Sequence, residues 1–312
     1  MRILLVNVDS VIPNLALEKL RIYYERQGDK VTLIKDETLL PFVDAYEQIY
    51  VSCVFDYNKH RCRKWRGLAD IGGSGYSLKK HLPAVIEKIK PKINLGFATR
   101  GCIRNCYFCI VPEKEGKIHI VGDIYDLWDG KGKDIILLDN NTLAIPKHFF
   151  KISKQLKKEN LKVDFNQGLD HRLLTNKICK ELFSLKHFRE IRFAFDHISY
   201  KKSVLKALTL LRKNGLKDWQ TRWYIYVGIK DNIDTVLQRI NILRNAKQLV
   251  YLMRDKAVQN NPEYARDLLV WCNYPGLYKS TPFCKRILDI QKNRRIIDNR
   301  PNLFEDKRSE QK

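Results

Sequence analysis

The sequence predicts an α/β fold: a small parallel α/β domain followed by a partial (β/α)6 barrel. Short runs of β-branched and aliphatic residues alternate with stretches of helical period along most of the 312 residues. Six strand–helix units follow one another between residues 93 and 252, fewer than the eight of a complete β/α barrel. A hydrophobic content of 44% with 11% aromatic residues excludes wholesale disorder. The chain is therefore expected to form folded domains with real cores.

Residues 1–91 are expected to form the first α/β domain. Strands are predicted at Arg2–Val8, Lys30–Lys35 and Gln48–Phe55, and helices at Leu15–Gln27 and from the turn Ile71–Gly75 through Ile89. This alternation predicts a parallel sheet with helices on its faces. Pro91 closes the domain, because proline interrupts regular elements.

Residues 92–260 are expected to form the partial barrel. Strands are predicted at Ile93–Ala98, Asp134–Leu138, Lys162–Phe165, Glu190–Phe195, Arg222–Val227 and Gln248–Leu252. Helices are predicted at Gly122–Trp128, Pro146–Lys158, Asn176–Leu185, Tyr200–Asn214 and Asn232–Asn245. Residues 261–312 are read as a C-terminal extension, helical at Tyr264–Trp271 and ending in a tail polar enough to be disordered.

The chain is strongly basic, with 58 Lys and Arg against 35 Asp and Glu and a net charge of +23. Such a field favours polyanions, so a nucleic acid is one candidate substrate or partner. The alternative is a compositional bias, because the lysines are spread along the whole length; charge alone does not decide. No apolar run approaches the roughly 20 residues of a membrane span. We expect a cytoplasmic protein without membrane contact, and the sequence does not indicate its oligomeric state.

Three of the eight cysteines, Cys102, Cys106 and Cys109, lie in one short loop after a predicted strand. Thiolates are the ligands of iron–sulfur clusters, and four are needed to fill a cubane. Three from one loop leave one iron open for a further ligand. The alternative is a structural metal knot in a non-enzymatic nucleic-acid-binding protein. Zinc sites usually add a second cysteine pair or histidines downstream, and no such pair follows here.

The C-x3-C-x2-C spacing, with Phe108 directly before Cys109, resembles the signature of the radical S-adenosylmethionine (radical SAM) enzymes. The resemblance covers residues 1 to about 285 and is strongest from 95 to 116. It implies a [4Fe–4S] cluster on the three cysteines and S-adenosylmethionine on the open iron. The cluster would cleave the cofactor to a 5′-deoxyadenosyl radical, with electrons from a flavodoxin or ferredoxin type of donor. It also implies that Phe108 faces the adenine and that Gly228, after a predicted strand, packs near it.

Polar residues at the ends of the predicted strands supply further candidates, since barrel enzymes carry their sites there. Asn140 and Asn141 follow one strand, where the family usually has Gly-Gly-Glu around the methionine amino group. Gln167 and Arg172 follow the next strand. Arg172 could bind the cofactor carboxylate or an anionic substrate in bidentate fashion. A structural pair of Arg172 with Asp170 is an equal alternative.

Two subfamily resemblances compete for the specific reaction. The stretch Phe97–Gly116 looks like the corresponding region of the tRNA methylthiotransferases, which implies an RNA methylthiotransferase or methyltransferase as an alternative function. Those proteins carry three further cysteines for a second cluster, whereas residues 1–91 hold only Cys53 and Cys62.

The first domain looks more like the Rossmann-like cobalamin-binding domains found upstream of many radical SAM barrels. The Asp-x-His-x-x-Gly signature that supplies their axial histidine is absent. Whether the first domain binds cobalamin therefore stays open, and the alternative that this domain only caps the barrel is slightly favoured. Phe165–Asp170 and Met253–Val258 resemble fixed features of an uncharacterised branch of the superfamily, some of whose members are carried by phages.

Overall fold

The structure, a computed structural model, describes residues 1–36, 43–228, 231–255 and 262–284. The chain divides into two compact units. The first comprises Met1–Ala194 and Lys202–Lys217, and the second Phe195–Lys201 and Asp218–Lys312. This division does not separate residues 1–91 from residues 92–194, so the domain boundaries expected from the sequence stay predictions.

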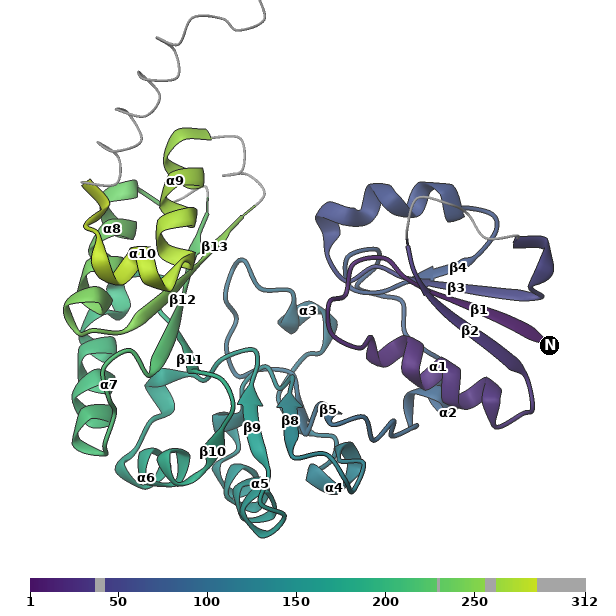
Figure 1. Cartoon of the computed structure of the whole chain (residues 1–312), viewed down its shortest axis with the longest axis horizontal. Helices are drawn as coiled ribbons and strands as arrows, with labels where there is room; N and C mark the ends of the chain where they lie inside the picture. The colour runs from purple at the N-terminus through teal and green to yellow at the C-terminus, as the bar shows by residue number, and fades with distance from the viewer. Residues whose placement is uncertain (37–42, 229–230, 256–261, 285–312) are drawn as a thin grey trace, which may run out of the picture. The chain divides into compact units, whose positions relative to one another are not determined.

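A four-stranded parallel sheet in the order β2-β1-β3-β4 forms the amino-terminal part of the first unit (Figure 1). Its strands are β1 (Arg2–Asn7), β2 (Lys30–Lys35), β3 (Gln48–Ser52) and β4 (Asp70–Gly72). In the register of the sheet, Leu4 of β1 lies opposite Thr32 on one side and Ile49 on the other. Residues 3–6 are completely buried, as expected for a central parallel strand that is covered on both faces.

Helical segments cover the two faces of this sheet (Figure 1). Leu4 and Val6 pack with the 3-10 helix η2 (Asp56–Trp65), whereas the alternate residues Ile3 and Leu5 pack with α1 (Leu15–Glu25) and α2 (Ala84–Glu87). Asn14 caps α1 by accepting hydrogen bonds from the first turn. A further 3-10 helix, η1 (Val43–Ala45), precedes β3.

The helix predicted to follow the turn at Ile71–Gly75 and to run through Ile89 is largely wrong, because only Ala84–Glu87 is helical. The turn itself is present, although Ile71 belongs to β4. Gly73 turns the chain with a φ of +94°, and an added Cβ would lie 2.2 Å from the carbonyl oxygen of Cys53. Pro83, which lacks a backbone N–H, precedes α2 as its N-cap and cannot lie inside a longer helix.

A second parallel sheet of the first unit has the order β10-β9-β8-β5. Its strands are β5 (Leu95–Gly96), β8 (Asp134–Leu137), β9 (Lys162–Phe165) and β10 (Lys186–His187), and β11 (Ile191–Ala194) comes next in the chain. The predicted strand at Ile93–Ala98 is shorter than expected, because Asn94 has a φ of +60° and the strand begins after it.

The helices of this part match the prediction closely. They are α4 (Ile124–Leu127), α5 (Pro146–Lys158), α6 (Asn176–Ser184) and α7 (Lys201–Lys213), together with the 3-10 helices η3 (Thr142–Ala144) and η4 (His171–Leu173). Proline at the first position begins α5, and the Thr175 hydroxyl caps α6. The apolar face of α5 is buried at Phe149, Ile152 and Leu156.

The segment with the three cysteines lies in a hairpin that the sequence did not predict. Strand β6 (Thr99–Arg100) pairs antiparallel with β7 (His119–Ile120), and the short helix α3 (Val111–Lys114) lies between them. The cysteine loop is therefore fixed at both of its ends.

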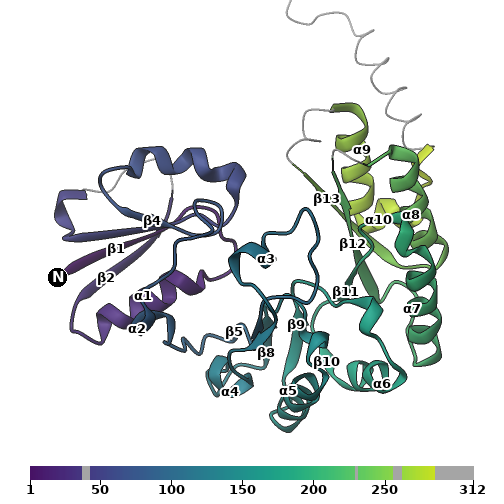
Figure 2. The same ribbon diagram turned by 180° about the vertical axis from the view of Figure 1, so that it is seen from behind.

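In the second unit, β12 (Thr221–Val227) and β13 (Leu249–Arg254) pair in parallel and are connected by α8 (Ile233–Asn245). Figure 2 shows the two strands side by side, with α8 and α9 (Pro262–Asn273) next to them. The 3-10 helix η5 (Ile198–Tyr200) and α10 (Pro275–Ser280) complete the unit. Within the described ranges, none of the helices has the length and apolar character needed to cross a membrane.

The α/β class with parallel sheets is confirmed. Closure of the strands into a partial barrel stays a prediction.

Candidate metal and cofactor site

The entry to the cysteine loop is fixed by Gly101. Its φ is +78°, and an added Cβ would lie 2.3 Å from the carbonyl oxygen of Lys117 on the opposite side of the hairpin. The Cys102 N–H donates to the Gly116 carbonyl at 3.2 Å. Because only glycine combines this φ with so close an approach, residue 101 brings Cys102 directly against the returning chain.

Asp139 ties the carboxyl end of β8 to the base of the hairpin. It is 2% exposed and accepts hydrogen bonds from Ala98 N, Thr99 N and Thr99 Oγ1 at 2.8, 2.9 and 2.6 Å. Burial raises the pKa of this carboxyl to about 6, although the same hydrogen bonds act in the opposite direction. Asp139 is therefore a structural anchor below the loop.

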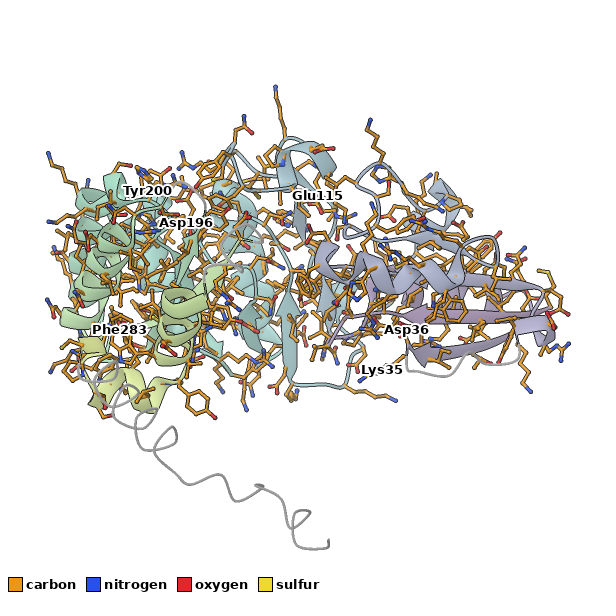
Figure 3. The ribbon with its side chains drawn as sticks, turned by 90° about the horizontal axis from the view of Figure 1, so that it is seen from above. Lys35, Asp36, Glu115, Asp196, Tyr200 and Phe283 are labelled. Carbon is orange, nitrogen blue, oxygen red and sulfur yellow. The ribbon has the colours of Figure 1, made fainter. Side chains whose placement is uncertain are left out.

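Glu115 closes the other side of the loop (labelled in Figure 3). Its Oε2 accepts from Gly101 N at 3.0 Å and from Asn140 Nδ2 at 2.5 Å. Arg100 lies 3.5 Å from the second carboxylate oxygen. The predicted cofactor residue Asn140 thus contacts the cysteine loop, through a carboxylate that the sequence analysis had not selected.

None of the three cysteines forms a disulfide, and each is partly exposed. The Cys109 N–H donates to the Cys106 carbonyl at 3.0 Å. The Cys102 sulfur accepts from Arg104 N at 3.3 Å and lies 3.5 Å from Asn141 Nδ2. In the described part of the chain, no three His, Cys, Asp or Glu side chains are arranged to hold a single metal ion.

Asn141 provides the test of whether these residues fit a bound group. The side chain is 2% exposed, and its Nδ2 faces Cys102 and Asp170. Its Oδ1 is buried and has no hydrogen-bond partner among the described residues. An unsatisfied buried oxygen costs free energy unless a further donor is present. Beside three thiols of the kind that bind iron, Oδ1 is suited to a polar donor on a bound cofactor, and the residues fit the implied group.

Asp170 holds the outer side of the loop to the turn after β9. Its carboxylate accepts from Arg104 Nε at 2.8 Å and from Arg172 Nε and Nη2 at 2.7 and 3.2 Å. Burial opposes ionisation of Asp170, but the hydrogen bonds from Arg172 and Arg104 outweigh it and keep its pKa below the ordinary value. The structural pair of Arg172 with Asp170, one of the two alternatives for this arginine, is therefore present.

Three further predicted residues have other surroundings. Phe108, within the cysteine loop, packs edge-on against Tyr107, with ring centroids 5.2 Å apart. Gln167 is exposed in the turn after β9. Gly228 belongs to the second unit, where its N–H donates to Asp231 at 2.8 Å. The structure brings together the cysteine loop, Asn140, Asn141 and, through Asp170, Arg172.

Sequence reasoning did not select Arg104, Glu115 or Asp139, and it considered Asp170 only as a structural partner of Arg172. Arg104 and Glu115 lie in or beside the cysteine loop, and both are charged. Both residues could have been selected because they are charged and lie in a short loop that is expected to bind a cofactor. Charged side chains in such a loop need partners.

Cys53 and Cys62 do not form a comparable site. Both are completely buried in the core where η2 packs on the first sheet. Burial raises the pKa of each thiol, which disfavours the thiolate. A second cluster that uses them would have to open this core.

A pocket of about 400 Å³ lies between α1, α2 and the first sheet, and it reaches the carboxyl ends of β3 and β4 at Ser52 and Gly72. Its lining includes Ser52, Gly73, His81, Arg100 and Lys114. Parallel α/β sheets commonly bind ligands at this edge. This is the place where a cofactor of the amino-terminal domain, cobalamin included, would be sought.

No protein-family model and no curated protein matches this sequence.

Proposed function

We propose that this chain is a radical SAM enzyme whose iron–sulfur cluster is held by Cys102, Cys106 and Cys109. The observation that carries the proposal is the position of three partly exposed cysteines in one loop beside the buried Asn141, whose Oδ1 has no hydrogen-bond partner among the described residues. Three thiolates leave one position of a cubane open, and Asn141 offers an acceptor for a polar cofactor there.

The bound group would supply chemistry that no side chain can: one-electron reduction of S-adenosylmethionine, which cleaves it to methionine and a 5′-deoxyadenosyl radical. The chain's own residues hold the cysteine loop in position. Asp139 and Glu115 fix the two sides of the hairpin, and Asp170 holds Arg104 within the loop. Such support keeps ligands in place before the cofactor binds.

Among the residues expected to line the pocket, Asn141 is the one best supported, because its amide lies against the Cys102 sulfur. Asn140 acts through Glu115, and the Nε and Nη2 groups of Arg172 bind Asp170, so we propose a positioning role for both. Phe108, Gln167 and Gly228 stay candidates from the resemblance. An electron donor of the flavodoxin or ferredoxin type and a cytoplasmic location belong to the same proposal.

The test is anaerobic reconstitution of the full chain with iron and sulfide, followed by dithionite and S-adenosylmethionine. We expect about four irons per chain and formation of 5′-deoxyadenosine. Cys106→Ala should lose the absorption of the cluster, the iron and the deoxyadenosine together. Cys284→Ala is the matched control, because that thiol is exposed and lies outside the loop.

Retention of deoxyadenosine formation by Cys106→Ala would contradict the proposal. Stoichiometric zinc without binding of S-adenosylmethionine would favour the metal-knot alternative. Cobalt retained after incubation with hydroxocobalamin would show that the amino-terminal domain binds this cofactor. An RNA methylthiotransferase remains the less favoured reaction, because the burial of Cys53 and Cys62 opposes a second cluster.

A further inference from the structure

The 3-10 helix η2 is anchored by one row of side chains. A 3-10 helix has 3.0 residues per turn, so residues three positions apart lie above one another. Cys62 and Trp65 form such a row and are 0% and 1% exposed, packed on the sheet with Leu4 and Val6. This row holds η2 rigidly against the domain.

A second row is used in ion pairs. Arg61 and Lys64 lie 3.2 and 2.9 Å from the Asp36 carboxylate, which also accepts from Trp65 Nε1 at 3.0 Å. Asp36, labelled in Figure 3, is 6% exposed. The pairing neutralises part of the charge of this row and further fixes the helix.

The third row faces solvent. It consists of Tyr57, His60, Arg63 and Arg66, all of them exposed, and is called here the outer row. Neither Arg63 nor Arg66 pairs with a carboxylate in the ranges that the structure describes. The imidazole Nδ1 of His60 lies 2.9 Å from the Tyr57 carbonyl oxygen. The outer row thus presents two guanidinium groups that no described carboxylate neutralises.

An exposed aromatic pair lies at one end of the outer row. Phe55 and Tyr57 stack with centroids 5.4 Å apart and an interplanar angle of 16°. They remain 43% and 50% exposed. Large aromatic rings usually bury much of their surface, so a stacked pair in solvent marks a candidate contact surface.

The charge of the segment selects the partner. Residues 59–66 contain Lys59, His60, Arg61, Arg63, Lys64 and Arg66 and no acidic residue. Guanidinium groups bind phosphate, and exposed rings offer a stacking surface to unpaired bases of any sequence. We propose that Phe55 and the outer row form a binding surface for single-stranded nucleic acid. Phosphates bind Arg63 and Arg66, and a base stacks on Tyr57.

This surface is independent of the cysteine loop, so the inference goes beyond the proposed function. The surface is complete in the chain without iron. Failure of the chain to assemble a cluster would therefore leave the nucleic-acid inference untouched, and failure to bind nucleic acid would leave the cluster proposal untouched.

The experiment measures fluorescence anisotropy of a labelled oligouridine of about twenty nucleotides with the full chain, over a range of salt. We expect Arg63→Gln combined with Arg66→Gln to weaken binding at least about tenfold and to reduce the slope of log K against log salt by about 1.4, for two lost phosphate contacts. The matched control is Lys147→Gln with Lys154→Gln, which removes two exposed charges from α5.

Tyr57→Ala separates stacking from charge. We expect it to weaken binding about fivefold or more with an unchanged salt slope, and Tyr57→Phe to restore binding. All of the substituted positions are exposed, so thermal unfolding should be unchanged in every variant.

Three results would overturn the inference: equal weakening by the α5 control, full binding by Tyr57→Ala, or equal binding of the oligouridine and its duplex with oligoadenosine. Vesicles containing phosphatidylserine that displace the oligonucleotide from the wild type, but not from the Arg63/Arg66 variant, would show that the surface serves a lipid instead.

Discussion

Two carboxylates support the cysteine loop, and their pKa values are shifted in opposite directions. Asp170 has a lowered pKa because Arg172 and Arg104 donate to it, whereas Asp139 has a raised pKa because burial dominates over its neutral donors. Asp170 is therefore an ion-pair partner at neutral pH. Asp139 is a hydrogen-bond acceptor whose charge opposes folding.

Asp170→Asn should loosen the loop. The variant keeps the size of the side chain but loses the charge that binds Arg104 and Arg172. Because both arginines are partly exposed, we expect a loss of about 1–3 kcal/mol in the free energy of unfolding. Urea unfolding measures it, and the iron bound after reconstitution should fall as well.

The control for Asp170 is Asp134→Asn, at the exposed start of β8. It should change stability by no more than about 0.5 kcal/mol. Equal stability of the Asp170 variant and this control would show that the ion pairs contribute nothing.

The raised pKa of Asp139 predicts that the stability of the protein falls as the pH rises. Its folded pKa of about 6 exceeds the ordinary value of 3.8, so its contribution is fully present below pH 3.8 and is lost as pH rises through 6. The difference between these two pKa values corresponds to about 3 kcal/mol in the free energy of unfolding. Asp139→Asn should remove this component when unfolding free energies are compared between wild type and variant at several pH values. Parallel profiles for the two proteins would refute the assignment.

At the scale of elements, the β6–β7 hairpin determines where the cysteines lie. The sequence predicted one strand at Ile93–Ala98 and a loop after it, but the chain forms β5 and then a separate antiparallel pair. Antiparallel pairing of two-residue strands leaves no hydrophobic periodicity to detect. The turn at Gly101 is the local feature that makes this pairing possible.

Gly101→Ala tests the hairpin. Both Gly101 and Gly116 have positive φ, +78° and +68°, but only at residue 101 would a Cβ collide with backbone. We expect Gly101→Ala to destabilise the protein by about 1–3 kcal/mol more than Gly116→Ala, and to lower the bound iron. Chemical unfolding of the two variants under the same conditions provides the comparison, and equal losses would mean that strain in φ alone matters.

At the scale of the whole molecule, the net charge of +23 must be separated from the local surface on η2. A global field attracts any polyanion without regard to strand structure. A variant that combines Arg63→Gln and Arg66→Gln with Tyr57→Ala should therefore keep a weak binding that is equal for single-stranded and double-stranded nucleic acid. This residual binding should vanish near 1 M salt, where the Debye length is about 3 Å. Anisotropy titrations of both nucleic acids measure it, and a residual preference for single strands would place the binding surface elsewhere.

The sequence by itself determined the α/β class, most of the strand and helix positions and the cysteine triad. The period of the hydrophobic residues and the spacing of motif residues are local properties of the sequence, so β2, β9 and α5 could be predicted with their ends.

Only the tertiary structure decided which charged and polar side chains contact one another. Asp170 contacts Arg104 across 66 residues, Asp139 reaches Thr99 across 40, and Glu115 joins Gly101 to Asn140. The tertiary structure also determines that Cys62 and Trp65 of η2 are buried and that the outer row is exposed to solvent. Hydrogen bonds and ion pairs depend on distances in space between groups far apart in the chain, and no periodicity in the sequence encodes those distances.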